Sequence, residues 1–148
     1  YWAVLDGLVK EDFGTINVPI ARKAESIIER EVRDDGDVAI SHFKVLDRLA
    51  NMTVVEYTLE TGRTHHLRVH SKYIGHPIIG DSKYGDSSIN EQFRKKAGTK
   101  RQLLHAYEMV FPVCEGHFSY LSQKSFQAPL PNDFLKAMEY AKIHDWKE

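Results

Sequence analysis

The sequence has 148 residues, of which 42% are hydrophobic and 28% charged, a composition typical of one folded globular domain. Its formal net charge of −1 argues against a protein that binds polyanions through overall charge alone. The single cysteine excludes an internal disulfide, and no apolar run approaches the roughly 20 residues that cross a bilayer, so we expect a cytoplasmic protein with no membrane partner. The amino terminus lacks an initiator methionine and the pattern of a signal peptide, from which we expect a chain that begins inside a longer protein.

Charge is unevenly distributed along the chain. Residues 1–38 hold five Lys/Arg and nine Asp/Glu, a balance of −4, whereas residues 61–101 hold nine Lys/Arg and three Asp/Glu, a balance of +6. A basic block within a neutral chain predicts one face that meets phosphates. A solvated surface with many ion pairs is the alternative interpretation of the same block.

The first part of the chain is rich in strand signals. Residues 1–9 (YWAVLDGLV) predict a strand that ends in a turn, because they combine aromatic and branched side chains. Residues 39–49 and 52–60 predict an antiparallel hairpin. Between these segments, residues 10–38 are acidic and irregular, and residues 21–32 fit a short helix or a loop or hairpin equally well.

The pattern changes to that of a helix after the second predicted hairpin strand. Residues 63–74 (RTHHLRVHSKYI) contain no glycine or proline and space their apolar residues by one or two helical turns. Thr64 is a suitable N-cap, and Gly75 followed by Pro77 ends the helix.

The remaining elements complete one domain. A glycine-rich loop leads to a short exposed helix at residues 89–98. Strands at 103–112 and 117–125 predict a second hairpin, and an amphipathic helix covers residues 133–146. The order predicts a single α+β domain over residues 1–148, with a mixed or antiparallel sheet and flanking helices.

Two histidines in the predicted helix raise the question of a metal. His66 and His70 lie four residues apart, the spacing by which zinc proteases place two ligands on one helical face. Such a site needs a glutamate directly after the first histidine, and this position holds Leu67, with no distal set of ligands following it. We therefore favour polar or core-packed histidines and expect no metal, with a metal-binding hydrolase as the weakest hypothesis.

A site for phosphate or carboxylate fits the same segment better. Gly62 permits close approach of the backbone to a ligand, and the helix start that follows presents free N–H groups beside Arg63. Arg68 lies deeper in the helix and is held more rigidly than an arginine on a loop. Its planar, permanently charged guanidinium suits an anionic partner.

Five blocks in order carry a resemblance to a known family. They are Tyr1-x-Ala3-x-x-x-Gly7, TGRTHHLRVH at 61–70, GHPIIGD ending in YG at 75–85, LLHA at 103–106 and SFQAPLPNDF at 125–134. The chain thereby resembles the RluA-type family of RNA pseudouridine synthases over nearly its whole length. The resemblance implies the pseudouridine synthase fold.

The resemblance also implies a reaction and roles for residues. Enzymes of this family break the N-glycosidic bond of a uridine in structured ribosomal or transfer RNA and rejoin the base through C5, with no metal or organic cofactor. Arg68 corresponds to the basic residue that pairs with the catalytic aspartate, whose pKa it would lower. Tyr1 corresponds to the tyrosine that packs against the flipped uracil and is the proposed proton-transfer group. The candidates for RNA contacts are Arg63, Thr64, His65, His66, Lys95, Lys96 and Arg101.

The chain departs from the family pattern at two points. His66 stands where the family has glutamine, and the HRLDxxTSG block with the catalytic aspartate does not occur in the sequence and would precede Tyr1. Asp47 is no substitute, because it lies in the wrong order and lacks a preceding His-Arg. We therefore expect the carboxyl-terminal part of a catalytic domain, truncated at its amino-terminal side and inactive alone. A non-catalytic RNA-binding module is the alternative.

The expected truncation leads to an expectation about assembly. A first strand that has lost its neighbour would present unpaired N–H and C=O groups, and a second copy of the chain would cover them. We therefore expect a homo-oligomer that forms through the edge of this strand. The alternative is a monomer whose first strand is paired internally, for instance by residues 118–125.

Overall fold

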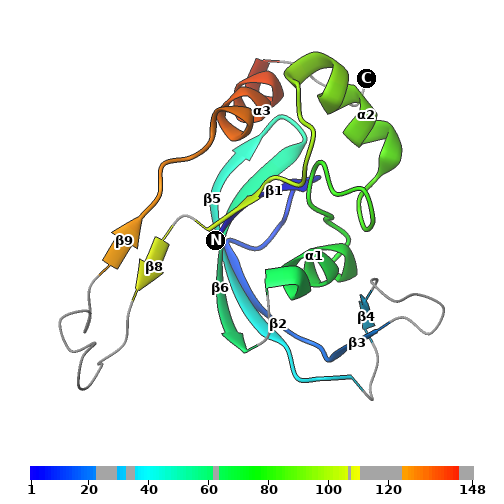
Figure 1. The fold of residues 1–148 in the computed structure, drawn as a ribbon, viewed down its shortest axis with the longest axis vertical. Coiled ribbons are helices and arrows are strands. Elements are labelled where there is room, and N and C mark those ends of the chain that lie inside the picture. Colours follow the sequence, from blue (N-terminus) through cyan, green and yellow to red (C-terminus); the bar gives the residue numbers. More distant parts are fainter. Residues whose placement is uncertain (23–29, 33–35, 62–63, 107, 111–124, 144–148) are drawn as a thin grey trace.

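A five-stranded antiparallel sheet forms the centre of the computed structural model, with strand order β2-β5-β6-β1-β7 (Figure 1). The structure describes residues 1–148 except 23–29, 33–35, 62–63, 107, 111–124 and 144–148. The strands of the central sheet are β1 (Trp2–Asp6), β2 (Phe13–Asn17), β5 (Ile40–Leu49), β6 (Met52–Thr61) and β7 (Leu104–His105). Two further antiparallel pairs are β3 (Ile20–Arg22) with β4 (Arg30–Val32), and β8 (Glu108–Val110) with β9 (Ser125–Gln127). Among the described helices, none has the length and apolar character needed to cross a membrane.

Helices cover both faces of this sheet, because successive residues of a strand point to opposite sides. On β1, Ala3 and Leu5 belong to the apolar cluster of α1 (Thr64–Tyr73), in which Leu67 is fully buried. Val4 belongs instead to the cluster of α2 (Ser87–Ala97) and α3 (Asn132–Ile143), which contains the buried Phe93 and Phe134. The α+β class and the antiparallel sheet predicted from the sequence are confirmed.

Helix α1 is fixed on the sheet by buried hydroxyl groups as well as by apolar contacts. The Tyr57 and Ser71 hydroxyl oxygens lie 2.6 Å apart, and Ser71 donates its own proton to the Leu67 carbonyl at 2.7 Å. Tyr57 must therefore be the donor to Ser71, and burial raises the pKa of this phenol while the bond to Ser71 partly opposes that rise. The register of α1 on β6 is thus set by a directional contact.

The local predictions fare unevenly. The predicted hairpin is confirmed as β5 and β6, and α1 ends at Tyr73, before Gly75 with its φ of +83°. For residues 21–32, the pairing of β3 with β4 supports the hairpin over the helix. The helix predicted at 89–98 begins earlier, at Ser87, because the Asp86 carboxylate accepts the backbone N–H groups of Ser88 and Ile89.

The second predicted hairpin is only partly right. The segment predicted as one strand at 103–112 is divided, because β7 joins the central sheet whereas β8 pairs with β9. Of the partner predicted at 117–125, only Ser125 lies within the described residues. The helix predicted as exposed at 89–98 also buries Phe93 completely.

The expectation that β1 has an open edge is wrong. Strand β1 pairs with β6 on one side and with β7 on the other, so it lies inside the sheet. On the second side, the Val4 N–H donates to the Leu103 carbonyl at 3.1 Å and the Asp6 N–H donates to the Pro77 carbonyl at 2.8 Å. The partners come from the segments at 77–79 and 103–105, and the physical reason given for a homo-oligomer at this edge is removed.

Candidate functional site

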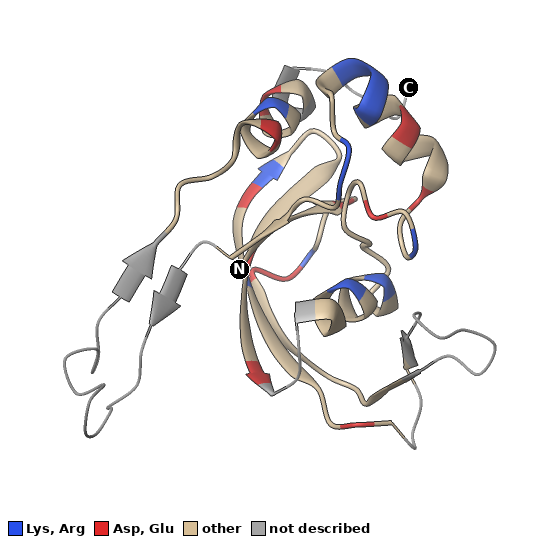
Figure 2. Cartoon of the chain, in the orientation of Figure 1, with Lys and Arg blue, Asp and Glu red and all other residues tan. Residues whose placement is uncertain are grey.

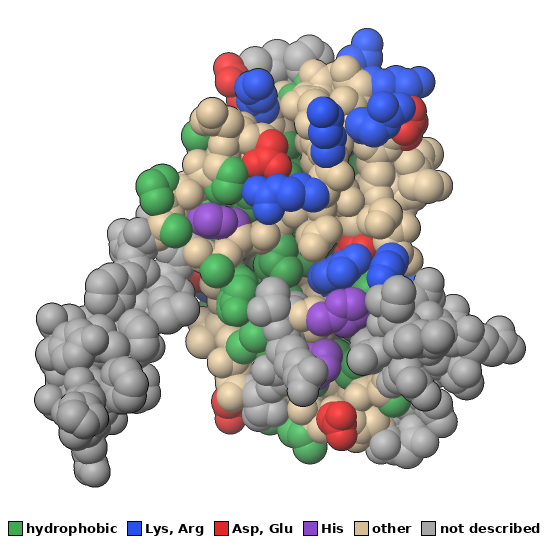
Figure 3. All heavy atoms as spheres, viewed as in Figure 1, with side chains coloured by type: hydrophobic (Ala, Val, Ile, Leu, Met, Phe, Trp, Pro, Cys, Tyr) green, Lys and Arg blue, Asp and Glu red, His purple; other side chains and the backbone are tan. Residues whose placement is uncertain are grey.

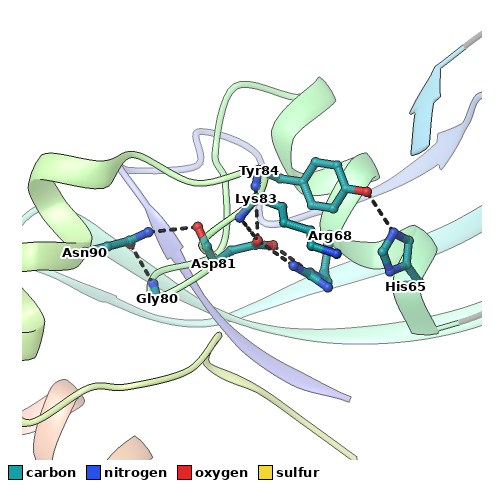
Figure 4. Close-up of polar contacts among 7 residues, drawn as sticks. All are labelled: His65, Arg68, Gly80, Asp81, Lys83, Tyr84 and Asn90. Atoms are coloured by element: carbon teal, nitrogen blue, oxygen red, sulfur yellow. Dashed lines mark hydrogen bonds and ion pairs between the residues drawn. The ribbon is translucent and has the colours of Figure 1, made fainter. Parts of the chain in front are cut away.

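Arg68 projects from α1 to a buried carboxylate on the loop that follows the helix (Figure 4). Its Nε donates to Asp81 Oδ2 at 2.8 Å and its Nη2 donates to Asp81 Oδ1 at 2.7 Å, a two-bond pairing of guanidinium and carboxylate. The Arg68 side chain is 13% exposed and that of Asp81 is 0% exposed. The hydrogen bonds to Asp81 raise the pKa of Arg68, so this guanidinium stays charged at any physiological pH.

Asp81 is held in place by its own loop. Its Oδ1 also accepts the backbone N–H groups of Lys83 at 3.0 Å and Tyr84 at 3.1 Å. Burial alone would raise the pKa of the Asp81 carboxyl, but the bonds from Arg68 and these two N–H groups hold it below its ordinary value. The carboxylate is therefore ionised and complements the charge of Arg68.

A side chain of α2 forms hydrogen bonds to the backbone of the same loop. The Asn90 side-chain oxygen accepts the Gly80 N–H at 2.7 Å, and its nitrogen donates to the Asp81 carbonyl at 2.8 Å (Figure 4). Gly80 has a φ of +86°, and a Cβ there would come within 2.2 Å of the Arg101 carbonyl oxygen, so only glycine fits. The position of Asp81 is thus determined from both sides.

Tyr84 completes the surroundings of Arg68. The Arg68 Cζ lies 5.1 Å from the centroid of the Tyr84 ring, within range of a cation–π contact. The Tyr84 hydroxyl lies 2.8 Å from His65 Nε2, and the two rings meet edge to face. His65, predicted to contact RNA, is therefore half-buried against Tyr84, and it borders the site without projecting freely from it.

Tyr1, the second residue to which the resemblance gives a catalytic role, lies on the same side of the sheet as α1. Its backbone exchanges two hydrogen bonds with Tyr57 of β6, of 3.0 Å and 2.6 Å. Its side chain is partly buried against the apolar cluster that contains Leu67, the residue before Arg68. The fold thus places the two predicted catalytic residues on one side of the sheet, Tyr1 directly before β1 and Arg68 on α1.

The two histidines of the metal hypothesis do not form a site. His70 is fully buried, with Nδ1 2.7 Å from the Ser41 hydroxyl and Nε2 3.1 Å from the Val18 carbonyl. A carbonyl only accepts, so Nε2 carries the proton and Nδ1 accepts from Ser41. Both ring nitrogens are occupied in the core, so His70 is the core-packed histidine that the favoured interpretation predicted and is not paired with His66 as a ligand. Within the described ranges, no group of three His, Cys, Asp or Glu side chains is arranged to hold a metal.

The basic block forms a surface that begins at α2. Figure 2 shows Lys and Arg on α1, α2 and the segment after α2, and Figure 3 shows these side chains gathered mainly over α2. Lys95 and Lys96 are exposed, and Lys95 Nζ lies 3.7 Å from Glu91. Arg101 is engaged with Asp133 of α3, with Nε 2.9 Å from Oδ2. Of the other RNA candidates, Arg63 and the side chain of Thr64 lie outside the described residues, and His66 is half-buried on α1.

Comparison with known proteins identifies the family. A family model described as RNA pseudouridylate synthase matches residues 1–73. An uncharacterized RNA pseudouridine synthase of Bacillus subtilis, YlyB, is 42% identical over 139 residues, which cover 94% of this chain and 42% of that protein. The chain belongs to the RNA pseudouridine synthase family.

Other members of the pseudouridine synthase family support the assignment. The ribosomal large subunit pseudouridine synthase D of Haemophilus influenzae is 33% identical over 150 residues, 96% of this chain and 44% of that protein. Human RNA pseudouridylate synthase domain containing 1 has a similar structure, with a TM-score of 0.69 and 26% identity over 93% of this chain and 55% of that one. The chain spans less than half the length of these curated relatives.

Sequence reasoning missed Asp81 and Asn90 as parts of this candidate site. Both stand in segments that the sequence marked, but Asp81 is 13 residues from Arg68 and no local period relates them. The one signal in the sequence was an acid at the end of a glycine-rich loop inside a basic block. Only the path of the loop across α1 makes it the partner of Arg68.

Proposed function

We propose that these residues form the arginine and tyrosine side of the active site of an RNA uridine-to-pseudouridine isomerase. The reaction breaks the bond from C1′ to N1 of uracil, forms the bond from C1′ to C5, and moves a proton from C5 to N1. Arg68 is proposed to orient and keep ionised an aspartate from an HRLD block that is not among residues 1–148. Tyr1 is proposed to pack against the flipped uracil and to serve the proton transfer.

The observation that carries the proposal is the way Arg68 is held. Asp81 takes the edge formed by Nε and Nη2, and the Tyr84 ring lies beside the guanidinium. Within the described residues, Asp81 is the hydrogen-bonding partner of the guanidinium, so the Nη1 side is left for a further carboxylate. Because a guanidinium has five N–H donors in a plane, it can serve two carboxylates at once, which an ammonium on a flexible stem does less well.

Contacts to the RNA backbone are proposed for the basic surface at α2 and after it. Lys95, Lys96 and Arg101 lie there, and Arg63, Thr64, His65 and His66 are proposed for the start of α1. Phosphate contacts of this kind supply affinity without sequence specificity. The partner that follows is a structured RNA, ribosomal or transfer RNA by analogy with the family.

The test compares two proteins on the same in vitro transcribed ribosomal RNA, with pseudouridine detected by carbodiimide labelling and primer extension. Residues 1–148 alone are expected to form none, and a protein that joins them to the HRLD block is expected to convert at least one uridine. Arg68→Ala in the longer protein is expected to abolish conversion. Conversion by residues 1–148 alone would mean that the nucleophile is misplaced. RNA binding without conversion by the longer protein would favour the non-catalytic RNA-binding module.

A further inference from the structure

Asp81 is a buried anion for which the fold provides four hydrogen bonds. Two come from the Arg68 guanidinium and two from the backbone N–H groups of Lys83 and Tyr84. A carboxylate that only had to neutralise Arg68 at the surface would need none of the backbone donors. Both backbone donors bind Oδ1 and fix that oxygen in space, and the guanidinium that binds Oδ1 and Oδ2 is thereby oriented.

The loop that carries Asp81 is itself held by α2. Asn90 of α2 binds the Gly80 N–H and the Asp81 carbonyl, and α2 begins at the Asp86 cap only a few residues after the loop. Every step from α2 to Arg68 is a hydrogen bond of 2.7–3.1 Å between buried or half-buried groups. The orientation of the Arg68 side chain is therefore fixed by α2 as well as by its own helix, α1.

We infer that Asp81 is a positioning residue for Arg68, and that Asn90 positions Asp81 in turn. This inference rests on the proposed function, because Arg68 matters there through the carboxylate it orients. Asp81 fixes the edge of Nε and Nη2, so that Nη1 is presented in one direction only. Its negative charge also offsets part of the positive charge of Arg68, and a nucleophilic carboxylate at Nη1 is consequently less stabilised than it would be beside a lone guanidinium.

These two actions of Asp81 predict two separate changes when its charge is removed, one in the catalytic rate and one in its pH dependence. Loss of orientation lowers the catalytic rate, because a displacement of about 1 Å in a reacting group costs on the order of 100-fold. Loss of the negative charge leaves the Arg68 charge to the nucleophile alone, which lowers the pKa of that carboxylate. The acid limb of the pH–rate profile therefore shifts to lower pH, whereas simple destabilisation of the fold does not shift it in that direction.

The experiment uses a protein that contains the HRLD block together with residues 1–148 and measures kcat, KM and the pH profile of uridine conversion. Asp81→Asn is expected to lower kcat by about 100-fold, with KM changed much less, and to shift the acid limb to lower pH. Asn90→Ala keeps the charge of Asp81 but frees its loop, so kcat falls by about 10-fold while the acid limb stays in place. The matched control is Asp47→Asn, an exposed acid of β5 outside this set of contacts, for which kcat and the pH profile are expected to stay within about twofold of the starting protein.

A second measurement on residues 1–148 is independent of activity. In 15N-labelled protein, the Arg68 side-chain N–H signals report whether rotation of the guanidinium is hindered. Slow, separate Nη signals are expected in the unsubstituted chain, and averaged signals in Asp81→Asn. Unchanged signals in that variant, or unchanged kcat and acid limb in the longer protein, would overturn the inference. If the longer protein formed no pseudouridine at all, the proposed function would fall, and the N–H signals would still decide whether Asp81 fixes Arg68.

Discussion

Arg68 brings a full positive charge to a place where only 13% of its side chain reaches solvent, and Asp81 opposite it is fully buried. Such a pair contributes little net stability compared with apolar residues, but removing one partner leaves the other uncompensated. The arrangement is therefore sensitive to single substitutions. At the scale of the residue, this sensitivity is the clearest property of the site.

Asp81→Asn is expected to lower the free energy of unfolding at pH 7 by about 3 kcal/mol, because it leaves Arg68 without its counter-charge. The pKa of Asp81 lies below the ordinary 3.8 in the folded chain, so its contribution is present above pH 3.8 and is lost as the pH falls below that value. Urea unfolding at pH 7 and from pH 5 to 3 measures both effects. The control Asp47→Asn, at an exposed position of β5, should change stability by less than about 0.5 kcal/mol, and an equal loss in both variants would contradict the assignment.

His70 links stability to pH in a second way. Burial lowers its pKa below the ordinary 6.5, the bond to the Val18 carbonyl partly opposes this, and a charge on His66 would lower it further. Below pH 6.5 the unfolded chain takes up a proton that the folded chain resists. The free energy of unfolding therefore decreases as the pH falls, by up to about 1.4 kcal/mol per pH unit. His70→Asn is expected to lower stability at pH 8 but to flatten its dependence between pH 6.5 and 5 in denaturant titrations. An unchanged slope would show that another group causes it.

At the scale of the element, two glycines with nearly equal φ angles require glycine for different reasons, one for its backbone conformation and one also for lack of space. Gly75, after α1, has a φ of +83° and nothing within 4 Å of a Cβ, whereas Gly80 has a φ of +86° and the Arg101 carbonyl oxygen at 2.2 Å. The first needs glycine for its backbone conformation alone. The second needs it for the approach of the 99–101 segment to the loop that holds Asp81.

Gly75→Ala is expected to cost about 1 kcal/mol, the cost of a left-handed residue with a Cβ. Gly80→Ala is expected to cost about 3 kcal/mol, because the collision with Arg101 adds to the same strain and displaces the loop. Thermal unfolding of both variants measures the difference. Equal costs for the two would mean that the 99–101 segment moves aside freely.

At the scale of the whole molecule, β1 is enclosed by segments that are distant in sequence. Its partner on one side is β6, and on the other side are β7 and the residues around Ile78. The edges of the central sheet are β2 and the short β7. Strand β1, which directly follows Tyr1, therefore lies between neighbours that fix its position relative to α1.

Hydrogen exchange tests this arrangement. The Val4 and Asp6 N–H groups, bonded to the Leu103 and Pro77 carbonyls, are expected to exchange at least 1,000-fold more slowly than unstructured peptide, as an order of magnitude for buried sheet amides. Exchange of these two amides at the rate of unstructured peptide would indicate that the edge of β1 is open in solution. The mass of the chain across a concentration series is the companion measurement, because slow exchange of both amides in a monomer can come only from partners within the same chain.

The charge distribution gives a prediction for RNA binding. Lys96→Ala on α2 is expected to weaken binding of a ribosomal RNA fragment and to reduce the slope of log affinity against log salt by about 1. Lys44→Ala, an exposed residue of β5 outside the basic block, is the matched control and should change neither quantity. Fluorescence anisotropy from 50 to 200 mM salt, roughly the range over which such contacts are lost, makes the comparison. Equal effects would indicate that binding is not localised at α2.

The sequence by itself determined what depends on local pattern. Alternation of apolar residues fixed the β5–β6 hairpin, and glycine at position 75 fixed the end of α1, because these signals act between residues a few positions apart. The ordered motif blocks pointed to the family that the comparisons then confirmed. Arg68 was also evident from the sequence, because its place within a predicted helix indicates a rigidly held guanidinium.

Only the tertiary structure decided which distant groups meet. It placed β1 inside the sheet, gave both nitrogens of His70 to Ser41 and Val18, and made Asp81 the partner of Arg68. No periodicity in the sequence relates these residues, because each contact depends on how the chain returns across the sheet. Burial then gave the contacts their chemical consequence, since a charge or a ring nitrogen removed from water must be satisfied by whatever group the fold brings to it.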